Sequence, residues 1–370
     1  MKAVVCKLTW LVCVLVVLFS SASRVSGASF IGPLNAIKAH ASTVPQNGDV
    51  NPYGVAVIPA SAGELEQGNL LVSNFNNAMN LQGTGTTIMQ VSGGAGHAKL
   101  FAQIDSSTLP GPCPGGVGLT TALVVLRSGW VIVGSLPTAD GSAATAQAGC
   151  LIVLNSSGQV VETISGGDIN GPWDMTALDM GSTAMLFVTN VLNGTVAANG
   201  SRVNGGAVLR ISLSTPVQGS GIPAETGRMV IASGFGERTD INALVIGPTG
   251  VGLGSDGTLY VADTLDSRIA AVPMAATRTT NDGTGTTVSM NGALNGPLGL
   301  TIAPNGDIVT VNAGDGNMVE TTPVGAQVTV KAVDVTNTGG GTLFGLAITL
   351  DREAVYFVND GNNTLDLLHR

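Results

Sequence analysis

Six short apolar runs in the chain each end in a polar residue, and most of these residues are Asn or Asp. They are Asn74, Ser135, Asn190, Asp263, Asn312 and Asn359. Amide and carboxylate oxygens are the ligands that Ca²⁺ prefers, and this ion takes six to eight of them. Asn and Asp also bond to their own backbone in turns and tolerate left-handed conformations. The turn interpretation is the simpler one, because the same residue type recurs in run after run and a dedicated ion site would break that symmetry.

A second set of residues precedes the apolar runs that lie upstream of the first six. Its members are Tyr53, Thr121, Trp173, Asn242, Leu298 and Phe344. Three of the six are aromatic, although aromatic residues make up only 4% of the chain. An apolar wall with few polar groups, here Asp174 and Asn242, is typical of a small-molecule site. The alternative is a hydrophobic plug that fills a narrow channel, and both interpretations stay open.

Other patterns of catalytic type lack the context that their chemistry needs. Residues 252–257 spell the G-x-G-x-x-G dinucleotide pattern, but a strand follows where phosphate binding needs the start of a helix. The chain has no G-x-S-x-G nucleophile elbow. Its three histidines, His40, His97 and His369, are too few and too scattered for a zinc cluster. The sequence therefore predicts no metal centre and offers no catalytic motif.

The polar and aromatic residues recur because the chain repeats one unit six times. The runs that end in the polar residues are 70–74, 131–135, 186–190, 259–263, 308–312 and 355–359. The upstream runs are 54–59, 122–126, 174–178, 243–248, 299–304 and 345–350, and a third run is clearest at 206–211, 268–272 and 364–368. Short β-branched runs between Gly, Asn, Asp and Pro are typical of strands joined by turns. Each unit predicts a four-stranded blade.

Six blades account for residues 28–370, so the sequence predicts one all-β domain, a six-bladed β-propeller. Radial packing of blades protects the strand edges that a single large sheet would expose. The last blade has residues for only three strands, and residues 29–43 precede the first blade without a blade of their own. We therefore expect the N-terminal segment to supply the missing strand and close the ring.

Two segments resemble a known repeat. Residues 256–269 (DGTLYVADTLDSRI) resemble the NHL-repeat consensus, and residues 295–307 (NGPLGLTIAPNGD) resemble its first half. Similar six-bladed propellers include the gluconolactonase-type and strictosidine-synthase-like groups. The resemblance implies that metal ligands, mostly Asn and Asp, would lie in the register of Tyr53 and its counterparts. Only Asn242 would qualify here, which argues against a lactonase that depends on a divalent ion.

Residues 1–27 have the features of a secretory signal peptide. Lys2 and Lys7 precede an apolar core over residues 8–19, and small residues follow. Val25 and Gly27 suit positions −3 and −1 for cleavage before Ala28. A membrane anchor is the alternative, but this core falls short of the roughly 20 residues that span a bilayer. We expect a secreted or otherwise extracytoplasmic protein with no membrane span after cleavage.

The cysteines and the net charge further limit the classes of protein to which the chain could belong. Cys113 and Cys150 remain after residue 27, and a pair in an exported chain predicts a disulfide, with two buried thiols as the alternative. The net charge of −9 argues against a nucleic-acid binder. With 44% hydrophobic and 11% charged residues, the chain is not a disordered polyelectrolyte.

These observations favour a non-catalytic binding module. We expect a monomeric, exported propeller that binds a protein, a glycan or a small molecule at its channel mouth or rim, with no cofactor unless the rim holds Ca²⁺. The first alternative is a hydrolase of the lactonase type with Asp174 and Asn242 in the channel. The second is a purely structural extracellular repeat protein.

Overall fold

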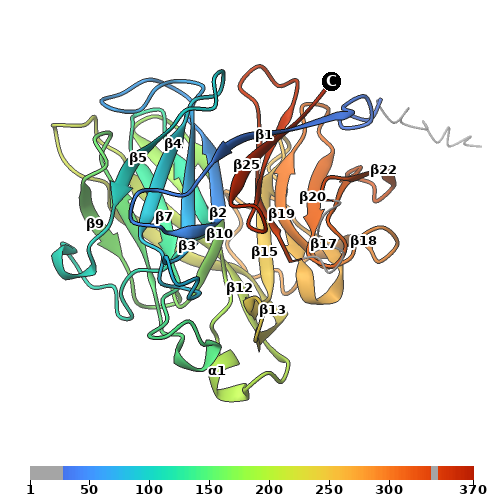
Figure 1. The fold of residues 1–370 in the computed structure, drawn as a ribbon. Coiled ribbons are helices and arrows are strands. Elements are labelled where there is room, and N and C mark those ends of the chain that lie inside the picture. Colours follow the sequence, from blue (N-terminus) through green and yellow to red (C-terminus); the bar gives the residue numbers. More distant parts are fainter. Residues whose placement is uncertain (1–27, 335–340) are drawn as a thin grey trace, which may run out of the picture.

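The protein is a six-bladed β-propeller (Figure 1). The computed structural model describes residues 28–334 and 341–370, so the predicted signal peptide lies outside the described residues. Six antiparallel sheets follow one another in chain order around a ring, and the sequence prediction of the fold is confirmed. None of the helices in the described ranges has the length and hydropathy to span a bilayer.

The strands of each blade run in order from the centre of the ring outward. Blade 1 comprises β2 (Val50–Val57), β3 (Leu70–Asn76), β4 (Thr87–Val91) and β5 (Ala98–Gln103); blade 2 comprises β6 (Leu119–Val125), β7 (Val131–Ser135), β8 (Cys150–Leu154) and β9 (Val160–Ile164). Blade 3 has five strands, β10 (Pro172–Asp179), β11 (Thr183–Asn190), β12 (Val203–Ser214), β13 (Ala224–Asp240) and β14 (Leu244–Ile246). Blade 4 comprises β15 (Pro248–Leu253), β16 (Leu259–Asp263), β17 (Arg268–Val272) and β18 (Thr286–Met290).

Blade 5 comprises β19 (Pro297–Ile302), β20 (Ile308–Asn312), β21 (Asn317–Thr321) and β22 (Gln327–Ala332). Blade 6 comprises β23 (Leu343–Ile348), β24 (Val355–Asn359), β25 (Thr364–His369) and, outermost, β1 (Ala36–Ser42). The described helices are short: α1 (Thr195–Ala198) and the 3₁₀ turns η1 (Ser106–Thr108), η2 (Ala143–Thr145) and η3 (Thr264–Asp266).

The N-terminal strand closes the ring, as the sequence predicts. β1 pairs antiparallel with β25, from Ala36 opposite His369 to Ser42 opposite Thr364. In Figure 1 the blue β1 lies beside the red β25, so the two ends of the chain share one sheet. The backbone hydrogen bonds of this pair therefore join the first and last parts of the described chain within blade 6.

Close packing of the inner strands explains why glycine recurs near their starts. A Cβ atom on Gly299 would lie 1.9 Å from the Phe344 carbonyl oxygen, and one on Gly345 would lie 2.5 Å from the Tyr53 carbonyl oxygen. Real Cβ atoms do not approach that closely, so only glycine allows neighbouring inner strands to meet in this way. Apolar side chains from the faces of adjacent blades fill the space farther out and form the core.

Blade 4 begins later than the sequence predicts. Its expected first strand, residues 243–248, is divided between β14, which pairs with β13 at the edge of blade 3, and the start of β15. Pro248 opens β15 opposite Asp263. Pro172 and Pro297 open two other inner strands in the same way, because proline lacks the N–H that a position deeper in a sheet requires. The long hairpin of β12 and β13 continues into β14, so the first strand of blade 4 starts at Pro248 and not at residue 243 as predicted.

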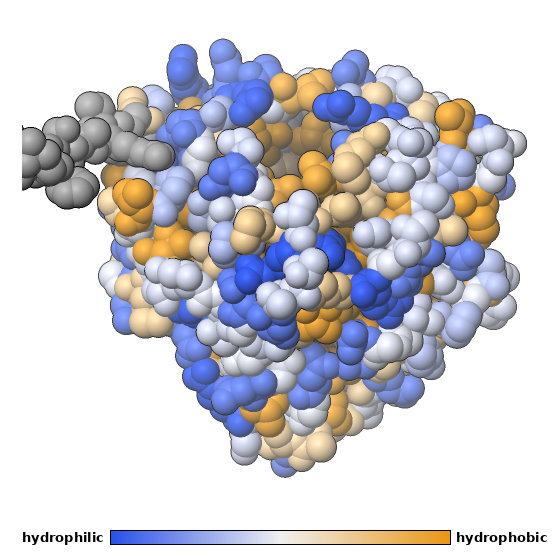
Figure 2. Space-filling view, turned by 180° about the vertical axis from the view of Figure 1, so that it is seen from behind, coloured by the Kyte–Doolittle hydropathy of each residue, from blue (hydrophilic) through white to orange (hydrophobic). Residues whose placement is uncertain are grey.

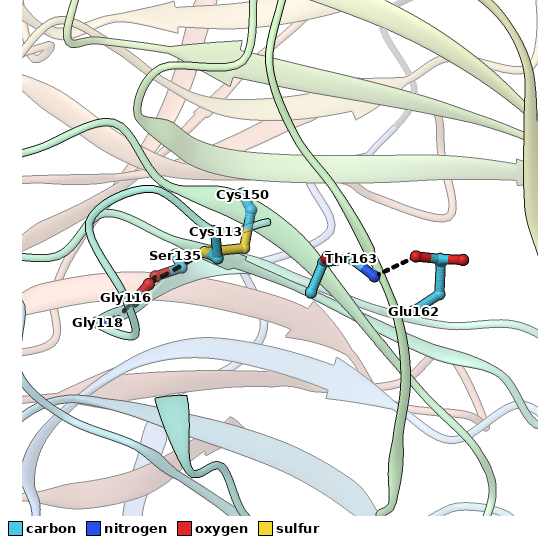
Figure 3. Close-up of a disulfide and its surroundings, with 7 residues drawn as sticks. All are labelled: Cys113, Gly116, Gly118, Ser135, Cys150, Glu162 and Thr163. Carbon is cyan, nitrogen blue, oxygen red and sulfur yellow. Dashed lines mark hydrogen bonds between the residues drawn. A yellow bond between two sulfur atoms is a disulfide. The ribbon is translucent and has the colours of Figure 1, made fainter. Parts of the chain in front are cut away.

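The predicted disulfide is present in blade 2. Cys113 and Cys150 are bonded, and their Cα atoms are 5.1 Å apart (Figure 3). Ser135 ties down the same loop, because its hydroxyl donates to the Gly116 carbonyl oxygen (3.0 Å) and accepts from the Gly118 N–H (2.9 Å). The disulfide thus links the loop before β6 to the start of β8.

Reduction of this disulfide is expected to lower the stability of the propeller. The bond closes a loop with a sequence separation of 37, which corresponds to about 3–4 kcal/mol in the chain-entropy description. Differential scanning calorimetry with and without reductant should show Tm falling by about 5 °C. The double variant Cys113→Ser/Cys150→Ser is the control, since reductant should leave its Tm unchanged. An equal response of both proteins to reductant would contradict the prediction.

Candidate functional site: the central channel

The channel between the six inner strands contains the candidate site. A cavity of about 380 Å³ is lined by residues of β2, β6, β10, β15, β19 and β23, towards the ends where these strands finish, and by Leu126 directly after β6. Figure 2 shows a hollow with hydrophobic residues on its walls, at the end of the molecule away from α1. Each inner strand pairs with a neighbour in its own sheet along one edge only. The other edge therefore presents peptide N–H and C=O groups to the channel.

The side chains of the cavity wall are largely aliphatic. Five of the six inner strands each contribute a large aliphatic side chain to the wall: Val55, Leu123, Val251, Leu300 and Leu346. Only two lining residues carry ionisable side chains, and both are aspartates of β10, Asp174 and Asp179. The wall thus offers apolar contacts, unpaired peptide groups and two carboxyl groups, and it offers no positive charge to an anion.

A cluster of aromatic rings blocks the opposite end of the channel. The Tyr53 ring stacks on Phe344 (3.7 Å between centroids) and on Phe75 (4.4 Å), and Trp173 meets Tyr53 edge-on at 5.8 Å. Tyr53 and Trp173 are each only 1% exposed. We call Tyr53, Phe75, Trp173 and Phe344 the aromatic plug. Of the two interpretations that the sequence leaves open, a plug agrees with this packing, because the rings are buried and do not line an open mouth.

Residues from β14 and from the segments after β7 and β11 pack against the aromatic plug. Leu136, Val191, Leu244 and Val245 belong to the same buried cluster as the plug. Leu244 has φ +61°, and the Val245 N–H bonds to the Ala243 carbonyl oxygen (2.7 Å), which makes a tight turn that is rare for a bulky residue. The burial of Leu244 against the plug holds the chain in this conformation.

Asp174 lies where the open channel meets the plug. Its Oδ1 accepts from the Met175 N–H (2.8 Å), and its Oδ2 accepts from the Val251 N–H on β15 (3.3 Å). Burial raises the pKa of this carboxyl to about 8, and the two amide donors lower it only in part. Asp174 nevertheless keeps some exposure to the channel. Burial therefore favours the protonated form of this carboxyl near neutral pH, and that form can donate a hydrogen bond to a molecule in the cavity.

Most residues of the predicted channel-mouth set meet around Asp174, but Asn242 does not. Thr121, Trp173, Leu298 and Phe344 border a small enclosed space together with Asp174. Asn242 is exposed on the loop before β14, where its carbonyl oxygen accepts from Gln82 Nε2 (2.9 Å). Its prediction as a channel residue is wrong, because it relied on the displaced first strand of blade 4.

Thr249 occupies the register that the sequence assigns to Asn242. It is buried, its hydroxyl donates to the Leu298 carbonyl oxygen (3.0 Å), and its own carbonyl oxygen accepts from the Thr189 hydroxyl (2.9 Å). The first bond joins the inner strands β15 and β19, and the second joins β15 to β11, the second strand of blade 3. The Gly-Pro pair at 247–248 was the available signal, since Gly171-Pro172 and Gly296-Pro297 precede Trp173 and Leu298 in the same way. Phe75 on the second strand of blade 1 carried no comparable signal.

The predicted polar rim residues are buried and hydrogen-bonded at the ends of the second strands. They are Asn74, Asn190, Asp263, Asn312 and Asn359. Asn74 Nδ2 donates to the Thr43 carbonyl oxygen (3.0 Å), and Asn359 Oδ1 accepts from the Gly361 N–H (3.0 Å). The Asn359 bond is a local contact of the kind that turn chemistry produces, whereas the Asn74 bond joins β3 to the segment that follows β1. Asp263 Oδ2 pairs with Arg268 at 2.8 Å. A Ca²⁺ ion at this rim stays a prediction from sequence alone.

No group of three or more His, Cys, Asp or Glu side chains within residues 28–334 and 341–370 is placed to hold a metal ion. A second buried acid, Glu237 on β13, lies outside the channel. Its Oε1 accepts from the Asn193 N–H (2.9 Å), and burial raises the pKa of its carboxyl to about 8. Burial therefore raises the pKa of Glu237 as it raises that of Asp174, but Glu237 does not line the cavity.

Comparison with solved structures shows the fold of this chain. A gluconolactonase of Xanthomonas campestris has a TM-score of 0.53 and 13% identity, with 87% of each chain covered. The calcium-binding protein regucalcin of Agrobacterium tumefaciens has a TM-score of 0.52 and 12% identity, with 89% of this chain and 96% of that chain covered. A PQQ-bound aldose sugar dehydrogenase of Streptomyces coelicolor has a TM-score of 0.51 and 14% identity, with 90% and 98% covered.

No family model matches the sequence, and no curated protein matches it. The structural resemblance to gluconolactonase-type propellers that the sequence suggests is confirmed at the level of the fold.

Proposed function

We propose that the protein is an exported binding module that takes up a neutral small molecule in its central channel. The molecule enters from the end opposite the aromatic plug, and Asp174 is the polar group that it meets at the bottom of the cavity. A sugar, or a lactone derived from one, is the class of ligand that suits this site. The disulfide between Cys113 and Cys150 supports export, because such bonds persist in oxidising compartments.

The observation that carries this proposal is the position of Asp174 in β10. The matching positions of the other inner strands hold Gly54, Ala122, Gly250, Gly299 and Gly345, so Asp174 alone places a carboxyl there. An uncharged carboxyl can donate to a carbonyl or hydroxyl oxygen, and the strand edges add further donors and acceptors. A neutral molecule rich in oxygen atoms matches these groups without the penalty of burying a charge.

A lactonase-type hydrolase is the second candidate, and one observation favours it. A buried carboxyl with a pKa near 8 is suited to donate or accept a proton close to neutral pH. The structural neighbours include a gluconolactonase. Because Asn242 lies outside the channel, Asp174 would have to act without the partner that the sequence suggested. The primary proposal requires binding alone.

Isothermal titration with D-glucose and with D-glucono-1,5-lactone tests both candidates. The binding proposal predicts that both probes bind the secreted protein and that Asp174→Ala weakens binding at least about tenfold, which corresponds to about 1.4 kcal/mol. Leu346→Trp, which fills the cavity, should abolish binding. The matched control is Glu237→Gln, which removes a buried acid of similar pKa outside the channel and should leave the affinity unchanged.

The same samples separate binding from catalysis. Proton release from the lactone, followed at constant pH, should not exceed the spontaneous rate if the protein only binds. A faster release that Asp174→Ala abolishes would favour the hydrolase. Binding that neither Asp174→Ala nor Leu346→Trp alters would place the ligand outside the channel and contradict the proposal, as would no binding of either probe.

A further inference from the structure

Glu320 on β21 is a fully buried carboxylate that holds the start of the described chain. Its Oε1 accepts from the Phe30 N–H (2.7 Å), and its Oε2 accepts from the Ile31 N–H (2.9 Å) and the Ser29 hydroxyl (2.5 Å). Hydrogen bonds to Glu320 of blade 5 thus hold the segment that leads into β1. In Figure 1 this blue segment begins beside the orange strands of blade 5 and then crosses to blade 6. The contact fixes where the closing strand enters the ring.

The side-chain amide of Asn305 connects Ala28 to the Glu320 carboxylate. Asn305 Nδ2 donates to the Ala28 carbonyl oxygen (3.3 Å), to Glu320 Oε1 (3.0 Å) and to Asp307 Oδ2 (2.9 Å). Asp307 is also buried. Ala28 is exposed, and because it is only two residues from Phe30, its nitrogen lies within about 10 Å of Glu320 Oε1, given the 3.8 Å between successive Cα atoms.

The two carboxyl groups lack a counter-charge in the described part of the chain. None of the ion pairs among residues 28–334 and 341–370 includes Asp307 or Glu320. Burial, together with the nearby Glu320, raises the pKa of Asp307 to about 6. Burial opposes ionisation of Glu320 too, but the donors from residues 29–31 outweigh it and lower the pKa of this carboxyl. The pair is therefore suited to receive one positive charge.

The signal-peptide cleavage that the sequence predicts would create a positive charge at Ala28. Val25 and Gly27 suit cleavage before Ala28, and cleavage would turn the Ala28 peptide nitrogen into an α-ammonium group. We propose that Asp307 and Glu320 form a binding site for the α-ammonium group of Ala28, so that removal of residues 1–27 completes the attachment of the closing strand. The site recognises the amino end of this chain and is independent of the function proposed for the channel.

Two properties follow from this arrangement. The ammonium group would be held by two carboxylates at the root of β1, which stabilises the strand that joins the two ends of the propeller. The same contact would raise the pKa of the α-amino group above its ordinary value of about 7.7–8.0, because nearby negative charge favours the protonated form. Both properties depend on the exact position of the new chain end.

An insertion variant tests the proposal with the full chain expressed in a secreting host. Two serines placed between Gly27 and Ala28 leave Val25 and Gly27 at positions −3 and −1, keep the sequence of β1, and move the ammonium group two residues from the carboxylates. Mass spectrometry should find Ala28 at the start of the unaltered secreted protein. We expect the insertion to lower Tm by about 1–3 °C and to speed acylation of the α-amino group at pH 7 by about five- to tenfold.

Variants that lack one of the two carboxylates serve as controls for the insertion. In Asp307→Asn and in Glu320→Gln, each of which keeps one carboxylate, the insertion should change Tm and the acylation rate by less than half as much as it does in the unaltered protein. If Glu320→Gln fails to fold, Asp307→Asn carries the comparison, because Asp307 makes no direct contact with residues 29–31. Equal Tm and equal acylation rates with and without the insertion would overturn the proposal. A full effect of the insertion in both backgrounds, or a secreted chain that starts at another residue, would overturn it too.

Discussion

Replacement of Trp173 by alanine is expected to lower the free energy of unfolding by about 3–5 kcal/mol. Trp173 is 1% exposed, and its ring meets both Tyr53 and Phe75 edge-on in the aromatic plug. Its removal deletes a large buried side chain at a place where six inner strands meet and where rigid backbone on all sides limits collapse. Chemical denaturation followed by circular dichroism measures the change.

Trp173→Phe is the matched control for this prediction. A smaller aromatic ring keeps part of the contact with Tyr53 and Phe75, so its loss of stability should be less than half that of Trp173→Ala. Trp130→Ala provides a second comparison, because Trp130 is equally buried but packs between blades 2 and 3, away from the channel. If Trp173→Ala unfolded at the same denaturant concentration as the unaltered protein, the plug would not be a packed part of the core.

Asp174→Asn is expected to make the protein more stable at pH 8 and to leave its stability nearly unchanged at pH 4. The ordinary pKa of the Asp174 carboxyl is 3.8, and burial raises it to about 8 in the folded protein. Between these values the folded state keeps a proton that the unfolded state releases, so stability falls as the pH rises. Asparagine has no such proton, and the gain at pH 8 should be roughly 2–5 kcal/mol.

Denaturation curves at pH 4, 6 and 8 measure this gain. Glu237→Gln should show the same trend, because burial raises the pKa of Glu237 to about 8 as well. The two variants should differ in ligand binding alone, since only Asp174 lines the cavity. An Asp174→Asn variant that loses stability equally at all three pH values would mean that the carboxyl is ionised in the folded protein and that its bonds to Met175 and Val251 stabilise the charged form.

The repeat made most of the fold predictable from the sequence. Each second strand combines an apolar run with a turn residue such as Asn312 or Asn359, and these local signals repeat six times, so errors in one blade do not spread to others. Closure by the N-terminal strand followed from the missing fourth strand of blade 6. The disulfide followed from two cysteines in a chain predicted to be exported.

The register of blade 4 and the shape of the channel were not predictable in the same way. The run at 243–248 has the composition of an inner strand, and only the pairing of β14 with β13 shows that residues 244–246 belong to blade 3. Whether Tyr53 and Trp173 form a plug or an open wall depends on Leu136 after β7 and on Leu244 in β14, which pack against them. Those contacts join distant parts of the chain, and no local pattern records them.

The position of a bound ligand tests the central claim most directly. Crystals of residues 28–370 soaked in 6-bromo-6-deoxy-D-glucose would locate the sugar through the anomalous scattering of its bromine atom. We expect a single strong peak inside the channel, with a sugar oxygen within hydrogen-bond distance of Asp174. A peak on the outer faces of the blades, or an empty channel at a saturating concentration of the sugar, would contradict it.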